Sequence, residues 1–289
     1  MIIEFIKAVF FGIIEGLTEW VPVSSTGHMI LLNEFLSLNV GANPEEFYSV
    51  FEVVIQLGAI MAVVILFWNK IWPFGKKNNQ SPLSDKGFGA YIKKDIFDLW
   101  FHIVVACVPA VIIGLLFDDL FEALFYNYQT VAIMLILFGI AFIIVETLHK
   151  GKSTKINSIA EIGYDTALII GAFQVLSLIP GTSRSGATII GGLSTGISRT
   201  VSAEFTFFLG IPAMFGASFL KLLKIGFHFS AHEFLELVIG MLVSFVVSVV
   251  VIRFLMGYIK KHDFKVFGYY RIGLGAIVLI VALIRAIAS

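Results

Sequence analysis

Charged residues and cysteine are scarce in this sequence. Only 14% of its 289 residues are charged, and 20 basic side chains balance 20 acidic ones, so the formal net charge is zero. Without an excess of positive charge the chain lacks the basic surface that nucleic-acid binding requires, and we expect no nucleic-acid partner. The single cysteine, Cys107, cannot form an internal disulfide, and the apolar run around it predicts a small buried hydrophobic side chain. The N-terminus lacks the basic segment and cleavage site of a signal peptide, so we expect it to belong to the mature protein.

Apolar residues, by contrast, are abundant and grouped into long runs. Hydrophobic residues make up 58% of the chain, and its mean hydropathy is +0.94, which indicates an integral membrane protein rather than a soluble domain. A transmembrane helix needs about 20 apolar residues. Six runs approach this length, near 51–68, 98–117, 129–147, 203–223, 234–257 and 267–287. The sequence therefore predicts an all-α integral membrane protein with six transmembrane helices.

A polar motif interrupts two further apolar segments and occurs once in each half of the chain. It reads GIIEGLTEWVPVSSTGHMI over 12–30 and GAFQVLSLIPGTSRSGATI over 171–189. An offset of 159 aligns Gly12 with Gly171, Glu15 with Gln174, Ser24 with Ser183, Ser25 with Arg184, and Gly27 with Gly186. Backbone broken by Gly and Pro is tolerated at membrane depth only where protein or a cavity shields it. We therefore predict that 2–37 and 162–195 form two re-entrant helix–loop–helix hairpins.

The connections between the apolar runs differ in charge, and this difference predicts an orientation. Those at 69–97 and 148–158 are basic, whereas the one at 118–128 is acidic. Their main charged residues are Lys70, Lys76, Lys77, Lys86, Lys93 and Lys94, then Lys150, Lys152 and Lys155, and finally Asp118, Asp119 and Glu122. Cytoplasmic loops of membrane proteins carry an excess of Lys and Arg. We therefore expect the two basic connections in the cytoplasm and the acidic one outside.

The second half distinguishes a re-entrant hairpin from a full crossing. If 162–195 returns to the cytoplasm, the later basic cluster of Lys260, Lys261 and Lys265 also lies inside, whereas a full crossing leaves it outside. The re-entrant arrangement is therefore favoured. Segment 2–20 is long enough to span by itself, so the side on which the N-terminus lies stays open.

Two halves of opposite orientation form an inverted-topology repeat. The first repeat covers 1–148 and the second covers 160–289, and each holds one hairpin followed by three spans. A second match supports the division, because Glu52 and Glu204 each precede a Leu-Gly pair by the same spacing. We interpret these two glutamates as residues that contact the site residues rather than the substrate.

Glu15 and Glu19 are four residues apart and share one face of an apolar helix. Two such carboxylates repel each other and lose hydration when buried, so they require a metal ion, another cation or a shared proton. Ionisable residues at membrane depth are usually functional, and we interpret both as catalytic residues and metal ligands. The alternative places Glu19 at the membrane surface and gives Glu15 a structural hydrogen bond.

The loop after this first helix is rich in hydroxyl groups. Pro22 ends the helix, and Ser24, Ser25, Thr26 and Gly27 follow. If a second helix opens directly after them, their N–H groups and hydroxyls form an anion site at a helix N-terminus. We therefore predict that this loop binds phosphate, and the alternative is a plain turn capped by Ser or Thr.

His28 follows this loop, three residues beyond Ser25 and about two helical turns beyond Glu19. An imidazole close to a hydroxyl and a carboxylate serves as a base, an acid or a metal ligand. A structural role is the alternative, and the position of His28 at the tip of a membrane-embedded loop favours a catalytic one.

The second loop carries an arginine among hydroxyl groups. We predict that it binds phosphate through Thr182, Ser183, Arg184, Ser185 and Gly186. A guanidinium at membrane depth costs several kcal/mol unless it meets an anion, and its planar fork suits phosphate. The alternative is an internal salt bridge between Arg184 and Glu15 or Glu19. The two interpretations are compatible, since Arg184 can pair with a carboxylate when no phosphate is bound.

The strings EGLTEWVPVSSTGH and PGTSRSGAT, in this order, resemble the undecaprenyl-diphosphatase family, also called the bacitracin-resistance family. The resemblance covers nearly the whole chain, and neither motif departs from the family pattern. It implies a multi-pass enzyme of the bacterial plasma membrane that hydrolyses undecaprenyl diphosphate to undecaprenyl phosphate, the lipid carrier for cell-wall glycans, and inorganic phosphate. It also implies a divalent cation, Mg²⁺ or Ca²⁺, and an active site open to the extracytoplasmic side, and a homodimer is a candidate assembly.

The resemblance assigns the family's glutamate motif to Glu15 and Glu19 and its two loops to Ser24–His28 and Pro180–Gly186. Our hypothesis is that Arg184 holds the diphosphate while Ser25 attacks the terminal phosphorus or positions a water molecule that does. His28 would transfer protons. Two other classes stay open: a transporter that flips a lipid phosphate, which the inverted repeat permits, and a non-catalytic lipid-phosphate receptor.

Overall fold

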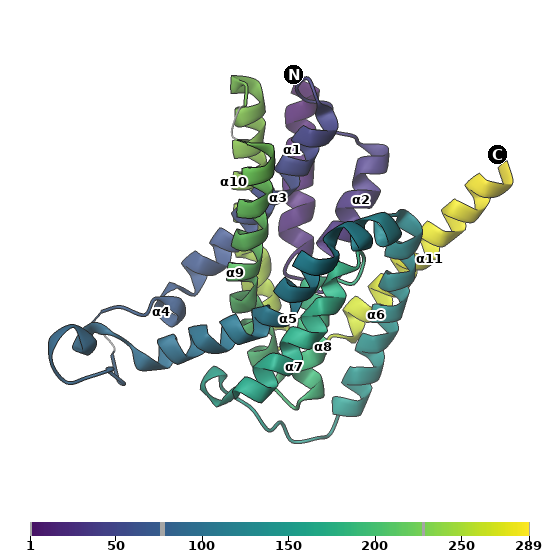
Figure 1. The fold of residues 1–289 in the computed structure, drawn as a ribbon. Helices are drawn as coiled ribbons and strands as arrows, with labels where there is room; N and C mark the ends of the chain where they lie inside the picture. The colour runs from purple at the N-terminus through teal and green to yellow at the C-terminus, as the bar shows by residue number, and fades with distance from the viewer. Residues whose placement is uncertain (1, 76–78, 227–228, 289) are drawn as a thin grey trace.

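The computed structural model describes residues 2–75, 79–226 and 229–288, with the backbone alone at 118, 119, 122 and 285–288. The described chain is helical and contains no strand, only isolated bridges in its connections. Its α-helices are Ile2–Thr18 (α1), Ser25–Phe35 (α2), Pro44–Leu66 (α3), Trp68–Ile71 (α4), Lys94–Phe125 (α5), Tyr128–His149 (α6), Tyr164–Val175 (α7), Arg184–Ser194 (α8), Arg199–Ile225 (α9), Ala231–Tyr258 (α10) and Lys265–Ala288 (α11) (Figure 1). Three short 3₁₀ helices are Gly87–Tyr91 (η1), Ile159–Glu161 (η2) and Leu176–Leu178 (η3).

Six helices within the described residues are long and apolar enough to cross a membrane: α3, α5, α6, α9, α10 and α11. They confirm the six predicted spans, although two of them are longer than expected. α3 begins earlier than predicted because Asn43 caps it and Pro44 occupies its first turn. α5 runs through Pro109 and continues to Phe125, so most of the predicted acidic connection is helix.

Both interrupted segments form a helix, a break and a second helix, as the repeated motif predicts. α1 packs against α10, and α7 packs against α5. The matched glycines Gly12 and Gly171 serve the same purpose in the two contacts. A Cβ at Gly12 would lie 2.6 Å from the Gly240 carbonyl, and one at Gly171 would collide with the Ala106 carbonyl. The helix before each break is therefore held against a long apolar helix by the close approach of two backbones.

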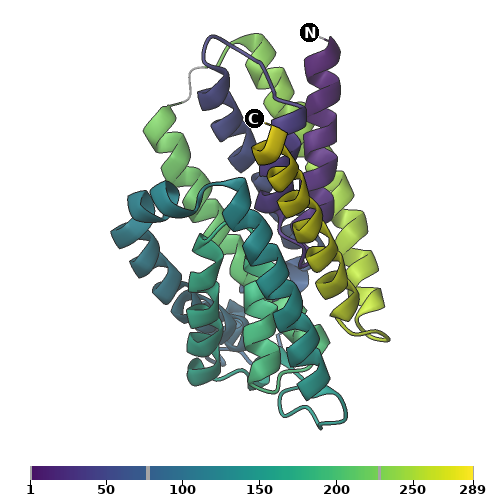
Figure 2. The ribbon, with the colours of Figure 1, turned by 90° about the vertical axis from the view of Figure 1, so that its right-hand side faces the viewer.

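The basic connections lie together at one end of the molecule. The Lys155 N–H donates to the Gly196 carbonyl at 2.9 Å, just before α9 begins. Lys70 forms an ion pair with Glu204, in the second turn of α9. The N-terminus lies at the opposite end (Figures 1 and 2). Lys76 and Lys77 lie outside the described residues, as do the side chains of Asp118, Asp119 and Glu122.

The core surrounds the two breaks rather than lying beside them. Trp20, in the first break, is fully buried, and its ring meets that of Phe207 edge to face at 5.3 Å. Phe142 on α6 and Phe205 on α9 are also completely buried in the same cluster. Packing of this kind shields irregular backbone from lipid, which the membrane interior requires.

Candidate active site

Each break ends at a serine that caps the helix after it in an unusual backbone conformation. Ser24 has φ 75° and Ser183 has φ 72°, and they are the non-glycine residues of the described chain with positive φ. Their hydroxyls accept hydrogen bonds from the N–H groups of Gly27 at 3.2 Å and Gly186 at 3.1 Å. Positive φ costs an L-residue about 1–3 kcal/mol and persists where the surroundings impose it. The breaks thus share one backbone form, and each starts a helix of 11 residues.

Glu19 joins the two breaks through its carboxylate. One oxygen accepts a hydrogen bond of 2.5 Å from the Ser25 hydroxyl, and the other accepts one of 2.9 Å from the Arg184 guanidinium. Glu19 and Ser25 are buried, and Arg184 is mostly so. Ser25 is the first residue of α2 and Arg184 is the first residue of α8, the positions that the offset of 159 aligns. A carboxylate, a hydroxyl and a guanidinium therefore meet at one point, an arrangement that could activate a serine nucleophile.

Arg184 is fixed by contacts beyond its ion pair. Its guanidinium donates to the Thr206 carbonyl at 3.0 Å and lies 5.9 Å from the centroid of the Trp20 ring. A Cβ at Gly210 would stand only 2.9 Å from one of its nitrogens, so glycine makes room for the group. The alternative salt bridge predicted for Arg184 is present, with Glu19 as its partner.

His28 lies one turn into α2 and contacts Tyr270 of α11. Its Nδ1 is 2.7 Å from the Ser24 carbonyl, and its Nε2 is 2.8 Å from the Tyr270 hydroxyl. The two rings are parallel, with an interplanar angle of 4°. Because a carbonyl only accepts, Nδ1 must carry the hydrogen, and the neutral ring then receives the Tyr270 proton at Nε2. Tyr270 was not identified from the sequence, since a tyrosine in an apolar run gives no signal of its own.

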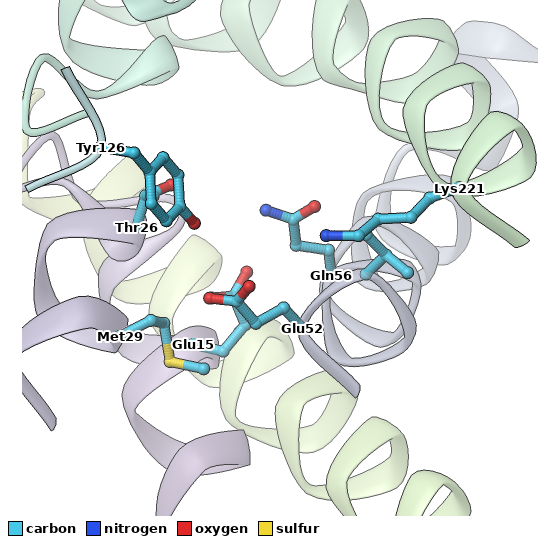
Figure 3. A pocket seen from close by; sticks show the side chains of 8 residues that line it. Glu15, Thr26, Met29, Glu52, Gln56, Tyr126 and Lys221 are labelled. Atoms are coloured by element: carbon cyan, nitrogen blue, oxygen red, sulfur yellow. The ribbon is translucent and has the colours of Figure 1, made fainter. Parts of the chain in front are cut away.

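Glu15 faces a cavity of about 150 Å³ next to the Ser25 loop. Figure 3 shows its carboxylate beside that of Glu52, with the amide of Gln56 close by. The cavity is lined by Glu15, Thr26, Met29, Glu52, Val53, Gln56, Tyr126 and Lys221. One oxygen of Glu15 is buried and has no hydrogen-bond partner among the described residues. Five of the eight lining side chains carry oxygen, and an unsatisfied carboxylate among them suits a hard divalent cation.

The described residues contain no group of three or more His, Cys, Asp or Glu side chains placed to hold a metal. A cation here would take Glu15 and Glu52 from the protein, with Gln56 as a third oxygen donor, and complete its shell from elsewhere. Mg²⁺ is commonly bound in this way, by one or two carboxylates together with substrate phosphates. Glu19, predicted as the second ligand, uses one oxygen for Ser25 and the other for Arg184.

The hydroxyls of Ser183 and Ser185 in the second loop lie 3.1 Å apart. Ser183 caps α8, and Ser185 donates to the Glu19 carbonyl at 3.1 Å. The Thr182 hydroxyl is buried and has no partner in the described part of the chain. In the first loop, Ser24 caps α2 and Thr26 lines the cavity. Of the residues predicted to bind phosphate, Arg184 and Ser185 contact Glu19, Ser24 and Ser183 cap helices, and Thr26 lines the neighbouring cavity.

Arg271 of α11 connects the two breaks and was not identified from the sequence. Its guanidinium donates to the Pro22 carbonyl at 3.1 Å and to the carbonyls of Gly181 at 2.7 Å and Thr182 at 2.8 Å. The side chain is fully buried, and no carboxylate pairs with it among the described residues. An arginine inside an apolar run is itself a signal of function, and that rule applied to 267–287 finds it.

These features define a class: a multi-pass helical membrane protein in which buried charged and hydroxyl side chains gather where two broken helices meet. The chain belongs to the bacitracin resistance protein BacA family, whose model matches residues 8–277.

Curated relatives extend over almost the full length. An undecaprenyl-diphosphatase of Desulfitobacterium hafniense is 58% identical over 280 residues, which is 96% of each chain. Proteins of the same name from Enterococcus faecalis and Streptococcus mutans are 57% and 50% identical, and each match covers 98% of both chains.

Proposed function

We propose that this protein hydrolyses undecaprenyl diphosphate to undecaprenyl phosphate and inorganic phosphate. This reaction returns the lipid carrier used for peptidoglycan and other cell-wall glycans, and it fits the bacitracin resistance that names the family. The name of the relatives supports the substrate. The single observation that carries the chemistry is the Glu19 carboxylate, bonded at once to the Ser25 hydroxyl and the Arg184 guanidinium.

Substrate binding would change the partners of Arg184. A phosphate offers more negative charge than a carboxylate and matches the planar guanidinium fork. When the terminal phosphate takes over Arg184, Glu19 loses its cation and keeps Ser25. The carboxylate then becomes a stronger base toward the serine hydroxyl, at the moment when the phosphorus lies beside it.

The chemical step follows from these contacts. Glu19 takes the proton of Ser25 as the serine oxygen bonds to the terminal phosphorus and the bridging P–O bond breaks. The bond electrons leave with undecaprenyl phosphate, and water then cleaves the phosphoserine to release phosphate. In a second version Ser25 orients a water molecule that attacks directly. The His28–Tyr270 pair lies one helical turn beyond Ser25 and is our candidate for proton transfer to the leaving group.

A divalent cation, Mg²⁺ or Ca²⁺, would lie between Glu15 and Glu52 and supply charge neutralisation to the diphosphate. The ionisable groups around the site support this assignment. The cavity holds two carboxylates, from Glu15 and Glu52, and one ammonium group, from Lys221, while Glu19 pairs with Arg184. A diphosphate adds further negative charge to these groups, and a bound cation offsets it.

The site would open to the extracytoplasmic side of the plasma membrane. Tyr126, in the connection between α5 and α6 that we expect outside, lines the cavity. Lys221 lines it from the C-terminal end of α9, whereas Lys70 and Lys155 lie near the start of α9. The basic connections are therefore at the far end, as the excess of positive charge in the cytoplasm requires. A homodimer stays a sequence-based prediction.

Phosphate release by the purified protein in detergent tests the proposal, because detergent offers no second compartment. An enzyme releases phosphate from undecaprenyl diphosphate under these conditions, whereas a flippase or a lipid-phosphate receptor does not. Ser25→Ala and Glu19→Gln should each abolish release while the variants still bind the substrate. Full activity in Ser25→Ala would refute both versions of the chemical step.

A further inference from the structure

A folded arm leaves the helical body between α3 and α5. It comprises residues 68–75 and 79–94 and lies beside the first turns of α5, to the left in Figure 1. Backbone hydrogen bonds join its two sides, from Gly75 to the Tyr91 carbonyl at 2.7 Å and from Lys93 to the Pro73 carbonyl at 2.8 Å. The indole N–H of Trp100 on α5 donates to the Ile71 carbonyl at 2.8 Å and fixes the base of the arm. The arm is thus a defined structure with its own hydrogen bonds.

A continuous row of aromatic rings runs along the arm. Trp68 stacks on Trp72 at 4.5 Å, Trp72 meets Phe74 at 5.6 Å, and Phe74 lies 6.3 Å from Phe88. All of these side chains are exposed, from 40% for Phe74 to 72% for Phe88. Exposed apolar groups gathered in this way mark an interaction site.

The polar groups of the arm restrict where this site can lie. Irregular backbone facing lipid is not tolerated in the hydrocarbon core, so the arm does not lie at that depth. Tryptophan is enriched instead at the membrane–water interface, where its ring contacts acyl chains and its N–H reaches water. Lys86 and Lys94 are exposed and Lys93 is half-buried, against one acidic residue, Asp85, in the described arm. The combination matches a layer of negatively charged headgroups.

The level of the arm agrees with this placement. Lys70, at its base, pairs with Glu204 in the second turn of α9. The other basic connection reaches the same level through Lys155 and Gly196. Both lie at the end of the molecule where positive charge collects, and the positive-inside rule places this end on the cytoplasmic side. The membrane leaflet on that side carries acidic lipids.

We propose that the arm docks in the headgroup layer of this leaflet and binds acidic phospholipids. Lys86, Lys93 and Lys94 contact the phosphates, while Trp68 and Trp72 lie at the boundary with the acyl chains. The surface is separate from the diphosphate site and does not depend on the proposed reaction.

Lipid titration tests the electrostatic half of the proposal. Phosphatidylglycerol or phosphatidylcholine is added to the detergent-solubilised protein, and the melting temperature is followed. Phosphatidylglycerol should stabilise the wild type more, and less so at high salt. Changing Lys86, Lys93 and Lys94 together to Gln should raise the lipid concentration at half-effect about tenfold or more. The matched control changes Lys150, Lys152 and Lys155 to Gln. An equal loss in the control, or no loss in the arm variant, overturns the proposal.

Depth-dependent quenching tests the aromatic half. The protein is placed in vesicles containing lipids brominated near the headgroup or near the chain end, and tryptophan fluorescence is compared with that of a Trp68→Phe/Trp72→Phe variant. The component lost in the variant should be quenched mainly by the shallow bromines. Quenching by the deep bromines places the arm in the hydrocarbon. A further measurement introduces Phe88→Cys into a Cys107→Ser background and looks for crosslinks between copies of the protein. Crosslinking without quenching would mean that the arm contacts another protein rather than lipid. Either result overturns the proposal.

Discussion

Glu19 and Arg184 stand 165 positions apart in the sequence and form an ion pair of 2.9 Å between the two breaks. In a buried site each charge compensates the other, and removal of either one leaves its partner unpaired at a cost of several kcal/mol. The same pair orders the site, since the carboxylate that holds Arg184 also holds Ser25. Stability and activity are therefore linked through a single side chain.

Glu19→Gln should lower the rate of phosphate release by at least about 100-fold, because an amide cannot accept the Ser25 proton. It should also lower the melting temperature, because Arg184 loses its counter-charge. The Glu19→Gln/Arg184→Gln double variant should be more stable than the sum of the two single changes predicts, since no charge is left unpaired. Additive losses of stability would contradict the pairing.

Ser25→Ala should reduce activity to the background level, since it removes the hydroxyl bonded to Glu19. Ser185→Ala is the matched control. Its hydroxyl also bonds to Glu19, at the backbone carbonyl, and takes no part in proton transfer. We expect Ser185→Ala to retain activity within about tenfold. The measurement is the rate of phosphate release by each variant. An equal loss of activity in both would show that Ser25 has no special role among the neighbouring serines.

Substitution of the two cap serines should favour glycine over alanine by more than capping alone accounts for. Alanine at Ser24 or Ser183 removes the cap and keeps the strain of positive φ, whereas glycine removes the cap and relieves the strain. The alanine variants should be less stable than the glycine variants by about 1 kcal/mol or more. Melting in detergent measures this difference. Alanine variants as stable as the glycine ones would show that the positive φ costs nothing here.

Arg271→Lys should lower activity although it keeps the charge. One ammonium group cannot reproduce a planar fork that donates to the carbonyls of Pro22, Gly181 and Thr182. The two breaks would shift relative to each other, so we expect kcat to fall more than KM rises. Arg253→Lys on the exposed face of α10 is the control and should change neither constant. A variant that changes only KM would assign Arg271 to substrate binding instead.

Chelation of divalent cations should abolish phosphate release, and Glu52→Gln should raise the cation concentration needed to restore it by about tenfold or more. Glu204→Gln is the control that the repeat provides. Glu204 occupies the position matched to Glu52, but it pairs with Lys70 at the other end of α9. If Glu52→Gln needed the same cation concentration as the wild type, Glu52 would be excluded as a metal ligand.

Local pattern was enough to predict the six spans and the two broken helices, because hydropathy and Gly/Pro breaks are properties of short segments. The partners of each side chain were harder to predict. Both glutamates were open as partners for Arg184, and the structure places Glu19 beside it. Glu15 shares a helical face with Glu19 but meets Glu52, since α3 lies alongside α1. Such choices depend on how helices rotate against each other, which no local pattern records.

The two breaks end on the same kind of capping serine with positive φ, and each starts a helix of 11 residues, so these helix starts do not distinguish the two copies. What distinguishes them is chemistry at aligned positions: glutamate against glutamine at 15 and 174, serine against arginine at 25 and 184, histidine against alanine at 28 and 187. The functional asymmetry of the two copies is therefore carried by a few side chains placed on two similar helix starts.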